Sequence, residues 1–217
     1  MRADCMRAMY RAPPRLACTA ARCGRRRRRD YNRAVDLTHQ FLIAMPAMAD
    51  PNFEGSVVYI CEHNDKGALG LVINRPTELT LACLFDKIEL KLEIAPWKDA
   101  PVLFGGPVQT ERGFVLHQPA GSFSSTLSVG DDIALTTSKD VLEAVARGAG
   151  PGKMLVTLGY SGWGAGQLEN EIVHNAWLTV QAQPGVIFDT PVEQRFHAAL
   201  SLLGIRSTQL MGQAGHA

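Results

Sequence analysis

The most informative segment of the chain reads MLVTLGYSGWGAGQLENEI, from Met154 to Ile172. Its first five residues are apolar or β-branched and follow a Gly-Pro-Gly sequence, which predicts a buried strand. Glycines then recur at every second or third position, so the backbone can turn sharply or be approached closely. Leu168 and Ile172 are four residues apart and share one face of a helix, which should begin after Gly166. The segment therefore predicts a strand, a tight glycine turn and a helix.

Ser161 stands in a pattern that approaches the nucleophile elbow of serine hydrolases. That motif reads G-x-S-x-G, because strand, serine and helix crowd together at the elbow. Here Trp163 occupies the place of the last glycine. A hydrolase would also need a histidine and an acid beside the serine, and the sequence spacing leaves both His117 and His174 open as partners. We therefore favour a tight turn in which Trp163 covers the core, and keep a hydrolase using Ser161 as the alternative.

A nucleotide-binding loop matches this segment less well. Gly162, Gly164 and Gly166 have the spacing G-x-G-x-G, and no Lys or Arg follows them. If Gly166 is the N-cap, Glu169 falls at the third helical position, where its carboxylate already lies near the positive end of the helix. A phosphate group would be repelled there, so we predict no nucleotide site.

The charge of the chain is divided unevenly along its 217 residues, although the formal net charge is only +1. Residues 1–33 contain eleven Arg and two Asp, a net charge of +9, whereas residues 34–217 contain eleven Lys or Arg and nineteen acids, a net charge of −8. The hydrophobic content of 46% is sufficient for a substantial core. No apolar run approaches the ~18 residues that a membrane span requires, so no membrane partner is expected.

Residues 1–35 form an Arg-rich extension with a run at Arg25, Arg26, Arg27, Arg28 and Arg29. Its apolar residues are too sparse and irregular to offset the entropy of ordering it, so we predict disorder. Three interpretations remain open: an arm that binds nucleic acid without sequence preference, a transit peptide, or a start codon assigned too far upstream. We favour the last.

The body, residues 36–206, is predicted to contain many short strands and few helices. Strands are expected at 41–45, 57–61, 68–74, 101–108, 113–117, 133–137, 154–158 and 177–180. Helices are expected at 81–88 with Thr80 as N-cap, at 139–147 with Ser138 as N-cap, after residue 166, and from a capping box at Thr190 to Gly204. Residues 89–100 are interpreted as a loop, and residues 207–217 as a frayed tail.

The connections between these elements indicate an α+β fold. Tight turns join the early strands, which must therefore be antiparallel. Helices occur singly and do not follow every strand, which argues against a doubly wound parallel sheet. No internal repeat is present.

Four segments of the body carry a family resemblance. They are LTHQFLIAMP at Leu37–Pro46, GALGLVINRP at Gly67–Pro76, GGPV at Gly105–Val108 and GYSGWGAGQLE at Gly159–Glu169. In this order they resemble the AlgH/YqgE family of bacterial proteins over about residues 36–206. The resemblance implies a mostly antiparallel, mixed sheet in a semi-barrel with a few single helices packed against it, and a cytoplasmic location. It also implies the label transcriptional regulator, which rests on genetics, and it assigns no catalytic residue and no cofactor.

Candidate residues for ligand or partner binding lie at the ends of predicted strands and in the glycine turns. They are Asn74, Arg75, Gly105, Gly106, Arg112, Ser161, Gly162, Trp163 and Gln167. Asn74, Arg75 and Arg112 either converge with Ser161 and Gln167 on one pocket or pair with carboxylates at loop ends, and we favour the second interpretation.

Metal binding is not expected. Cys61 and His63 alternate along a predicted strand and should share one face, but two ligands are too few for zinc. Cys61 and Cys83 are both interpreted as small core side chains.

The sequence therefore predicts a non-enzymatic binding or regulatory module that works through a protein or small-molecule partner and needs no cofactor. The acidic body should not bind DNA specifically, because its field repels a polyanion and it shows no helix-turn-helix. Non-specific binding could come only from the arginine run.

Overall fold

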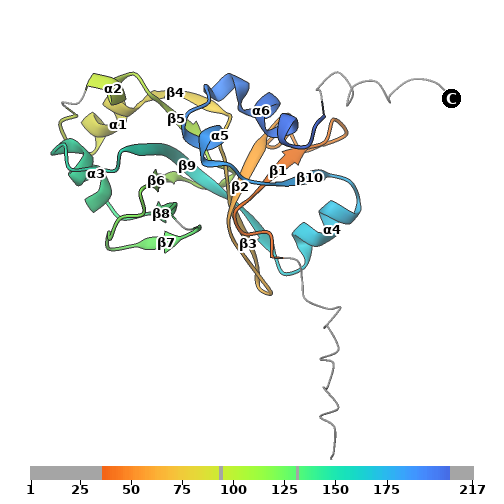
Figure 1. Ribbon diagram of the computed structural model, residues 1–217. Helices are drawn as coiled ribbons and strands as arrows, with labels where there is room; N and C mark the ends of the chain where they lie inside the picture. Colours follow the sequence, from red (N-terminus) through yellow and green to blue (C-terminus); the bar gives the residue numbers. More distant parts are fainter. Residues whose placement is uncertain (1–35, 93–94, 131, 206–217) are drawn as a thin grey trace, which may run out of the picture. The chain divides into compact units, whose positions relative to one another are not determined.

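The computed structural model describes residues 36–92, 95–130 and 132–205 (Figure 1), and the predictions for residues 1–35 and 207–217 lie outside them. The strands are β1 Gln40–Ala44, β2 Val57–Asn64, β3 Gly67–Val72, β4 Pro76–Thr80, β5 Pro101–Phe104, β6 Val108–Gln118, β7 Thr126–Ser128, β8 Ala134–Thr136, β9 Lys153–Gly164 and β10 Trp177–Gln181. The helices are α1 Leu81–Lys87, α2 Ala95–Lys98, α3 Asp140–Ala146, α4 Gln167–Val173, α5 Pro184–Phe188 and α6 Arg195–Leu202, with a 3-10 turn at Val192–Gln194. The fold is α+β, as the tight turns and single helices predicted.

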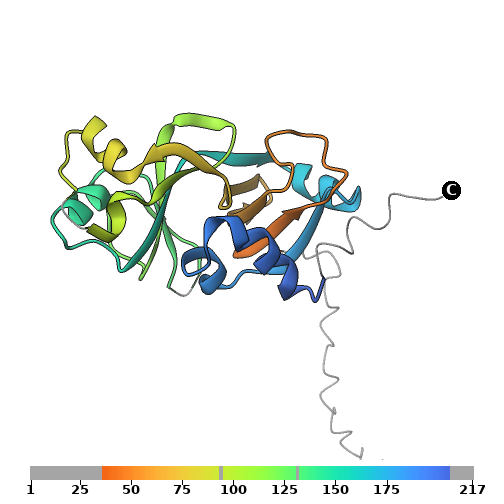
Figure 2. The ribbon, with the colours of Figure 1, turned by 90° about the horizontal axis from the view of Figure 1, so that it is seen from above.

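Strand β9 joins the two parts of the sheet (Figure 1). Within the described residues the sheet has ten strands, of which eight follow the order β10-β1-β2-β3-β9-β6-β8-β7, while β4 pairs with β5 and β5 with β9. The pairs are antiparallel apart from β5 with β9. The sheet curls into a half-barrel (Figure 2), in agreement with the semi-barrel that the family resemblance implies.

Two strands share one edge of β9 in succession. Strand β6 pairs with β9 along most of its length, so β5 and β3 must both lie on the other edge. There β5 pairs with Thr157 and Leu158, and β3 pairs with residues 161–164. Gly159 lies between the two pairings and has a φ of +74°. The pairing partner on this edge of β9 therefore changes from β5 to β3 at Gly159, where the backbone is left-handed.

Among the described residues, three clusters of buried side chains hold the sheet and helices together. The first lies on one face of the sheet and includes Phe41, Tyr59, Leu71, Leu116, Ile187 and Leu200, so that α5 and α6 cover it. The second lies on the other face of β1–β3, where Trp163, Leu168 and Trp177 meet the loop residue Phe53. The third contains Phe85, Val115, Val141 and Val156 beneath α1 and α3. Neighbouring strand residues point to opposite faces of a sheet, so most strands contribute to two clusters.

Several sequence predictions are confirmed in detail. The Asn64–Gly67 turn joins β2 and β3 as an antiparallel hairpin. Thr80 is the N-cap of α1, and its side chain accepts a hydrogen bond from Cys83 N. Gly166, at a φ of +71°, is the N-cap of α4. In each case a residue with a strong local preference decided the structure.

The predicted turn over Gly159 to Gly166 is wrong for most of its length, because β9 continues to Gly164 and the chain turns only at residues 165–166. Gly162 pairs with Leu69 of β3, and Tyr160 pairs with Val108 of β6. This glycine-rich segment would be a poor strand alone. Pairing with β3 on one edge and β6 on the other therefore holds it extended.

Two predicted helix caps are also wrong. The N-cap of α3 is Lys139, while Ser138 donates its hydroxyl hydrogen bond to Asp140. The Thr190 hydroxyl donates to Gly185 O in the preceding helix, and a 3-10 turn precedes α6. The sequence reading also missed β4, β7, α2 and α5, which are three to five residues long.

Cys61 and His63 do not share a face as predicted. The register of β2 against β3 shifts between Ile60 and Glu62, so Cys61 lies at a bulge and belongs to the first cluster. Burial raises the pKa of its thiol. His63 lies on the other face, where its Nε2 is 2.9 Å from Glu169 Oε1 and Nδ1 accepts from Leu37 N. A β-bulge changes which side chains of a strand lie on each face of the sheet. The alternation of apolar and polar residues in the sequence does not show where such a bulge lies.

In the described part of the chain, no helix combines the length and the apolar character required to cross a membrane.

Candidate functional site

The Gly105-Gly106 pair crosses β9 where β5 ends. Gly105 N donates to Leu158 O at 2.8 Å, and Gly105 O accepts from Val72 N at 2.9 Å and from the Ser161 hydroxyl at 3.1 Å. Gly106 has a φ of +150°, and a Cβ added to it would lie 2.3 Å from the carbonyl carbon of Tyr160. Close backbone contact therefore requires glycine at 106, and the pair fixes the junction of three strands.

Ser161 is fully buried at this junction. Its hydroxyl donates to Gly105 O, so the oxygen is directed into the protein. His117 is also buried, and its ring bonds Pro119 O at 3.0 Å and Thr136 Oγ1 at 2.9 Å. His174 bonds Asn170 O. In the residues that the structure describes, no histidine or acid is hydrogen-bonded to the Ser161 hydroxyl, so the geometry gives the hydrolase alternative no support.

Asn74 and Arg75 support the loop between β1 and β2. Asn74 accepts from Val57 N at 2.8 Å and donates to Gly55 O at 2.9 Å. The two terminal nitrogens of Arg75 donate to Pro51 O at 2.9 Å and Glu54 O at 2.6 Å. Both side chains therefore bond backbone groups, rather than the loop-end carboxylates that the sequence interpretation favoured.

Trp163 and Gln167 belong to an aromatic cluster organised by one carboxylate. Glu171 accepts from Trp163 Nε1 at 2.9 Å, Trp177 Nε1 at 2.8 Å and Gln167 Nε2 at 3.0 Å. Phe53 stacks on the Trp163 ring with 6.0 Å between centroids. The Trp163 ring thus covers part of the second core cluster, as the sequence interpretation expected.

Arg112 lies elsewhere, on the exposed part of β6. Its guanidinium donates to Thr137 Oγ1 at 3.2 Å and lies 5.7 Å from the centroid of the Phe114 ring. The predicted residues therefore do not converge on one cavity: Gly162 and Trp163 line the depression described next, and the others lie at the strand junction, between β3 and β4, on β6 or at the start of α4.

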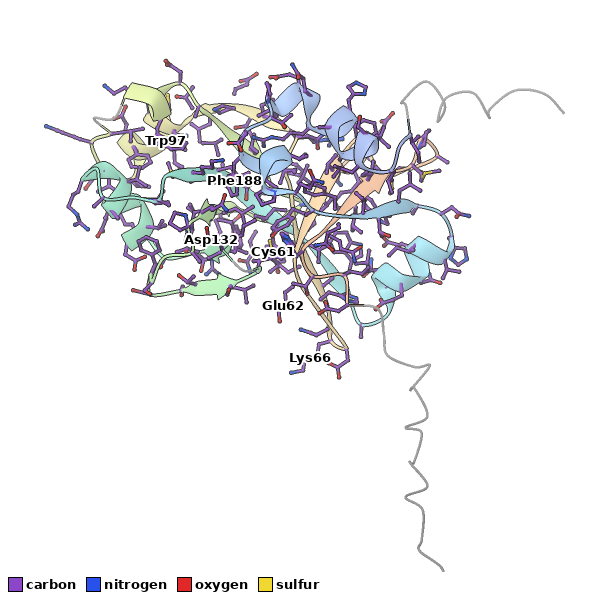
Figure 3. The ribbon with its side chains drawn as sticks, viewed as in Figure 1. Cys61, Glu62, Lys66, Trp97, Asp132 and Phe188 are labelled. Atoms are coloured by element: carbon purple, nitrogen blue, oxygen red, sulfur yellow. The ribbon has the colours of Figure 1, made fainter. Side chains whose placement is uncertain are left out.

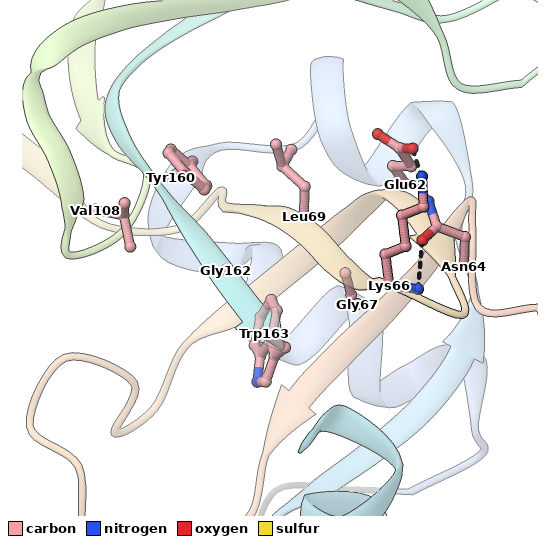
Figure 4. Close-up of a pocket in the computed structure, with 10 residues that line it drawn as sticks. Glu62, Asn64, Lys66, Gly67, Leu69, Val108, Tyr160, Gly162 and Trp163 are labelled. Atoms are coloured by element: carbon pink, nitrogen blue, oxygen red, sulfur yellow. Dashed lines mark hydrogen bonds between the residues drawn. The ribbon is translucent and has the colours of Figure 1, made fainter. Parts of the chain in front are cut away.

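An open depression of about 510 Å³ lies where β2, β3, β6 and β9 meet. Figure 4 shows Val108 and Tyr160 on one side of it, Glu62, Asn64 and Lys66 on the other, and Leu69 and Gly162 between them. The hairpin side of this rim is tied together, since Asn64 donates to Glu62 at 2.8 Å and accepts from Lys66 N at 2.8 Å. Glu62 and Lys66 lie at the free end of the β2–β3 hairpin (Figure 3).

The depression is open because glycines replace side chains on this face of the sheet. Gly162 pairs with Leu69 and Gly164 pairs with Gly67, and both glycines of β9 are exposed. Leu69 and Tyr160 pack against the first core cluster at its edge and remain partly exposed. We call this surface the glycine face: Glu62, Asn64, Lys66, Gly67, Leu69, Val108, Tyr160, Gly162 and Gly164.

A second hollow of about 350 Å³ adjoins the glycine face through Leu69. Phe114, Leu127 and Leu135 supply its apolar lining, and residues 124–126 with Thr137 supply hydroxyl groups. The two hollows together form a continuous, partly apolar surface at one edge of the first core cluster.

Sequence reasoning missed most of the glycine face. Glu62 and Asn64 are two residues apart on β2, next to a predicted turn. From this spacing alone, two exposed side chains on one face of the strand could have been predicted. Val108 and Tyr160 could not be found in this way, because their proximity depends on the pairing of β6 with β9.

No group of three or more metal-ligating side chains occurs in residues 36–92, 95–130 and 132–205.

Comparisons with known proteins agree with the fold. The family model described as AlgH-like matches residues 41–208. A UPF0301 protein of Cupriavidus pinatubonensis is 67% identical over 183 residues, covering 84% of this chain and 96% of the relative. A UPF0301 protein of Ralstonia nicotianae is 66% identical with the same coverage.

Comparison with solved structures supports the same fold. The solution structure of the AlgH protein from Pseudomonas aeruginosa is 53% identical, with a TM-score of 0.70 over 84% of this chain and 97% of that one. A crystal structure of a Corynebacterium diphtheriae protein, 20% identical, has a TM-score of 0.55 over 69% of this chain and 78% of that one, and shares the fold alone. The half-barrel sheet, the matched span and these relatives together show that the chain belongs to the AlgH-like family.

Proposed function

We propose that this chain is a non-catalytic binding module that engages another protein through its glycine face. The observation that supports this most directly is the exposed backbone at Gly162 and Gly164, bordered by the partly exposed Leu69 and Tyr160. Partly exposed apolar groups around an open depression with accessible backbone suit a macromolecular surface.

A protein suits this face better than a small ligand as its partner. Small-molecule sites usually enclose most of the ligand, whereas Glu62, Asn64, Lys66 and Gly162 are exposed around this depression. The adjoining hollow at Leu69 extends the contact area toward Phe114 and Leu127. The opposite charges of Glu62 and Lys66 on the rim would select the orientation of the partner.

Regulation of transcription, the role that the family label implies, would be indirect in this proposal. Residues 34–217 carry a net charge of −8, and a field of that sign repels DNA. We therefore propose that the module acts in the cytoplasm on a protein that itself contacts DNA or RNA polymerase.

Site-specific photo-crosslinking in the native host tests this proposal. A photoreactive residue at Glu62 or Val108 should capture the same protein, and one at Lys98, which is exposed on α2, should not capture it. The purified partner should then bind the Gly162→Arg variant about tenfold or more weakly than the parent chain. Equal capture from all three positions, or none from the glycine face, would contradict the proposal.

Folding of the Gly162→Arg variant must be checked separately by circular dichroism. Gly162 is exposed, and the nearest atom to an added Cβ is Tyr160 Cε2 at 3.1 Å, on a side chain that can move. We therefore expect the variant to fold, so that lost binding reports on the surface itself.

A further inference from the structure

Strand β10 forms one end of the sheet, because among the described strands it pairs with β1 alone (Figure 1). In an antiparallel pair, every second residue of a strand directs its backbone N–H and C=O groups at the same neighbour. Met45 N donates to Ala176 O at 3.0 Å, and Ala182 N donates to His39 O at 3.1 Å. The even-numbered residues of β10 therefore bond β1, and the odd-numbered residues direct their backbone groups away from it.

The free edge of β10 is accessible at Thr179 and Gln181. The backbone N–H and C=O groups of these two residues have no hydrogen-bond partner among the described residues. Gln181 is exposed and Thr179 is partly exposed, whereas Trp177, the preceding residue with the same orientation, is only 3% exposed. The Gln181 side chain donates to His39 O at 3.0 Å, so it is held toward β1 instead of across the free edge.

β10 lacks the features that protect β4 and β7, which also pair with a single described strand. Natural edge strands avoid association by being short, or by carrying charged residues or proline. β7 is three residues long, and β4 begins with Pro76 and contains Glu78. β10 has five residues, and no charged residue occurs from Asn175 to Phe188. Such an edge is suited to pairing with another strand.

The strand that fits this edge is a second copy of β10. When identical strands pair about a two-fold axis, any charge on the strand lies close to its own copy, so a strand without charges pairs with itself without repulsion. The same lack of charge leaves nothing at the edge that would select an acidic or a basic partner strand.

The accessible residues also define the register of this pairing. With the two-fold axis at Val180, Thr179 lies opposite Gln181 of the second copy, and each such pair exchanges two backbone hydrogen bonds. Val180 is partly exposed beside the first core cluster, and this axis places it opposite its own copy in a closely spaced apolar pair. An axis at Thr179 would instead require the backbone of the buried Trp177.

We infer that this chain forms a two-fold dimer in which β10 pairs antiparallel with β10 of a second copy, centred on Val180, so that two half-barrel sheets join edge to edge. β1 lies between β10 and β2, so this edge is separate from the glycine face and does not depend on the partner proposed above. The dimer presents two glycine faces, which increases its avidity for a partner that carries two binding segments. One short strand from each copy makes a small interface, so the dimer is weak and concentration-dependent.

The first test combines sedimentation equilibrium with NMR amide exchange on the full-length chain. Sedimentation over a wide concentration range should show monomer and dimer in equilibrium and no larger species. The amides of Thr179 and Gln181 should become protected from exchange as the dimer fraction rises. The amide of Ser128 on the free edge of β7 is the internal control and should not change.

Gln181→Pro is the decisive variant, because it removes an N–H group that only the dimer uses. Proline is tolerated on edge strands where the N–H faces solvent, so the variant should fold. Gln181→Ala is the matched control, since it loses the same side-chain bond to His39 O but keeps the N–H. The dimer dissociation constant should rise about tenfold or more in the proline variant, which loses a hydrogen bond from each copy, and by less than about threefold in the alanine variant.

Thr179→Lys tests the same pairing without a change to the backbone. It places two ammonium groups near each other across the axis, so the dimer should weaken at low salt and recover in part at high salt. Thr179→Gln, a neutral side chain of similar length, should dimerise like the parent. Circular dichroism melting curves of all four variants establish that they fold.

Several results would overturn the inference. They are a monomer at every concentration, a dimer that persists in Gln181→Pro, or protection that appears at Ser128 and not at Thr179. If the Thr179 and Gln181 amides of the pure chain stay exposed and become protected only when the protein captured at the glycine face is added, the edge belongs to that partner and self-pairing is wrong.

Discussion

The contact between Gly106 and Gly159 shows how far single residues determine this fold. A Cβ at Gly159 would lie 2.4 Å from Gly106 O, and one at Gly106 would lie 2.4 Å from Tyr160 O. The two segments therefore touch through their backbones alone. Ser161 reinforces this contact with one hydrogen bond, whereas Gly162 lies beyond it and is exposed.

We expect Gly106 to be far more sensitive to substitution than Ser161 or Gly162. Gly106→Ala should destabilise the fold by about 3 kcal/mol or more, because it combines backbone strain with a clash that no side chain can relieve. Ser161→Ala should cost about 1 kcal/mol, since Gly105 O keeps its bond from Val72 N. Gly162→Val should stay within about 1 kcal/mol of the parent. Urea unfolding at pH 7 measures all three.

Gly162→Val serves as the control in this series, because it adds more atoms than Gly106→Ala at a position that tolerates them. Equal unfolding midpoints for these two variants would show that the backbone crossing is not a stability determinant.

The candidate residues illustrate what single positions reveal before a structure is known. Gly106 could be predicted to allow close approach, since it belongs to a Gly-Gly-Pro sequence after an apolar strand. The uses of Asn74 and Arg75 could not, because the carbonyl groups that they bond lie 19 to 24 residues earlier in the chain. Nothing in the local pattern distinguishes a side chain that binds a ligand from one that holds a loop.

At the scale of elements, α3 depends on a carboxylate at its start. Asp140 accepts from Ser138 and from the backbone and hydroxyl of Ser124, so it ties the loop before β7 to the helix. The hydrogen bonds from Ser138 and then Ser124 lower the pKa of Asp140 from 3.8 to about 2.

This pKa shift predicts the direction of a pH effect. A carboxyl whose pKa is lower in the folded state stabilises the fold above pH 3.8, and that stabilisation disappears as the pH falls toward about 2. Asp140→Asn should therefore unfold more easily than the parent at pH 7, and the difference should shrink as the pH falls toward 2. Denaturant midpoints for both proteins between pH 2 and 7 provide the measurement. A constant difference across this range would contradict the assignment of the shift to Asp140.

Elements with strong local sequence signals could be predicted. Elements that depend on pairing with strands from elsewhere in the chain could not. The hydrophobic spacing of Leu81 and Phe85 with a Thr80 cap defined α1, which has both residues buried. By contrast, β7 is a three-residue strand that pairs with β8 alone among the described strands, and its sequence has no extended period. The second half of β9 was missed for the same reason, since its extension comes from β3 and β6.

For the whole molecule, the segregation of charge leads to a prediction about DNA. The full-length chain should bind duplex DNA without sequence preference through the +9 charge of residues 1–33, and the 36–217 fragment should not bind. Each phosphate contact lowers the logarithm of affinity by ~0.9 per unit of log salt concentration, so about five contacts give a steep slope. Gel-shift titrations at two salt concentrations, with a promoter and a scrambled duplex, measure both properties.

Promoter-selective binding by the 36–217 fragment at moderate salt would contradict this expectation. It would also restore direct regulation of transcription in place of a protein partner at the glycine face.

The position of β9 in the chain has a consequence for how the protein is made. Before Lys153–Gly164 leaves the ribosome, β2 and β3 can form their hairpin and β6 can pair with β8, but the strand that pairs with both β3 and β6 is still missing. Such long-range pairing is slow to form and leaves apolar strand faces uncovered meanwhile. The nascent chain therefore carries two unfinished sheets through most of its synthesis, and their closure waits for one late strand. Chaperones that shield nascent chains should have their longest contact with this protein before that strand emerges.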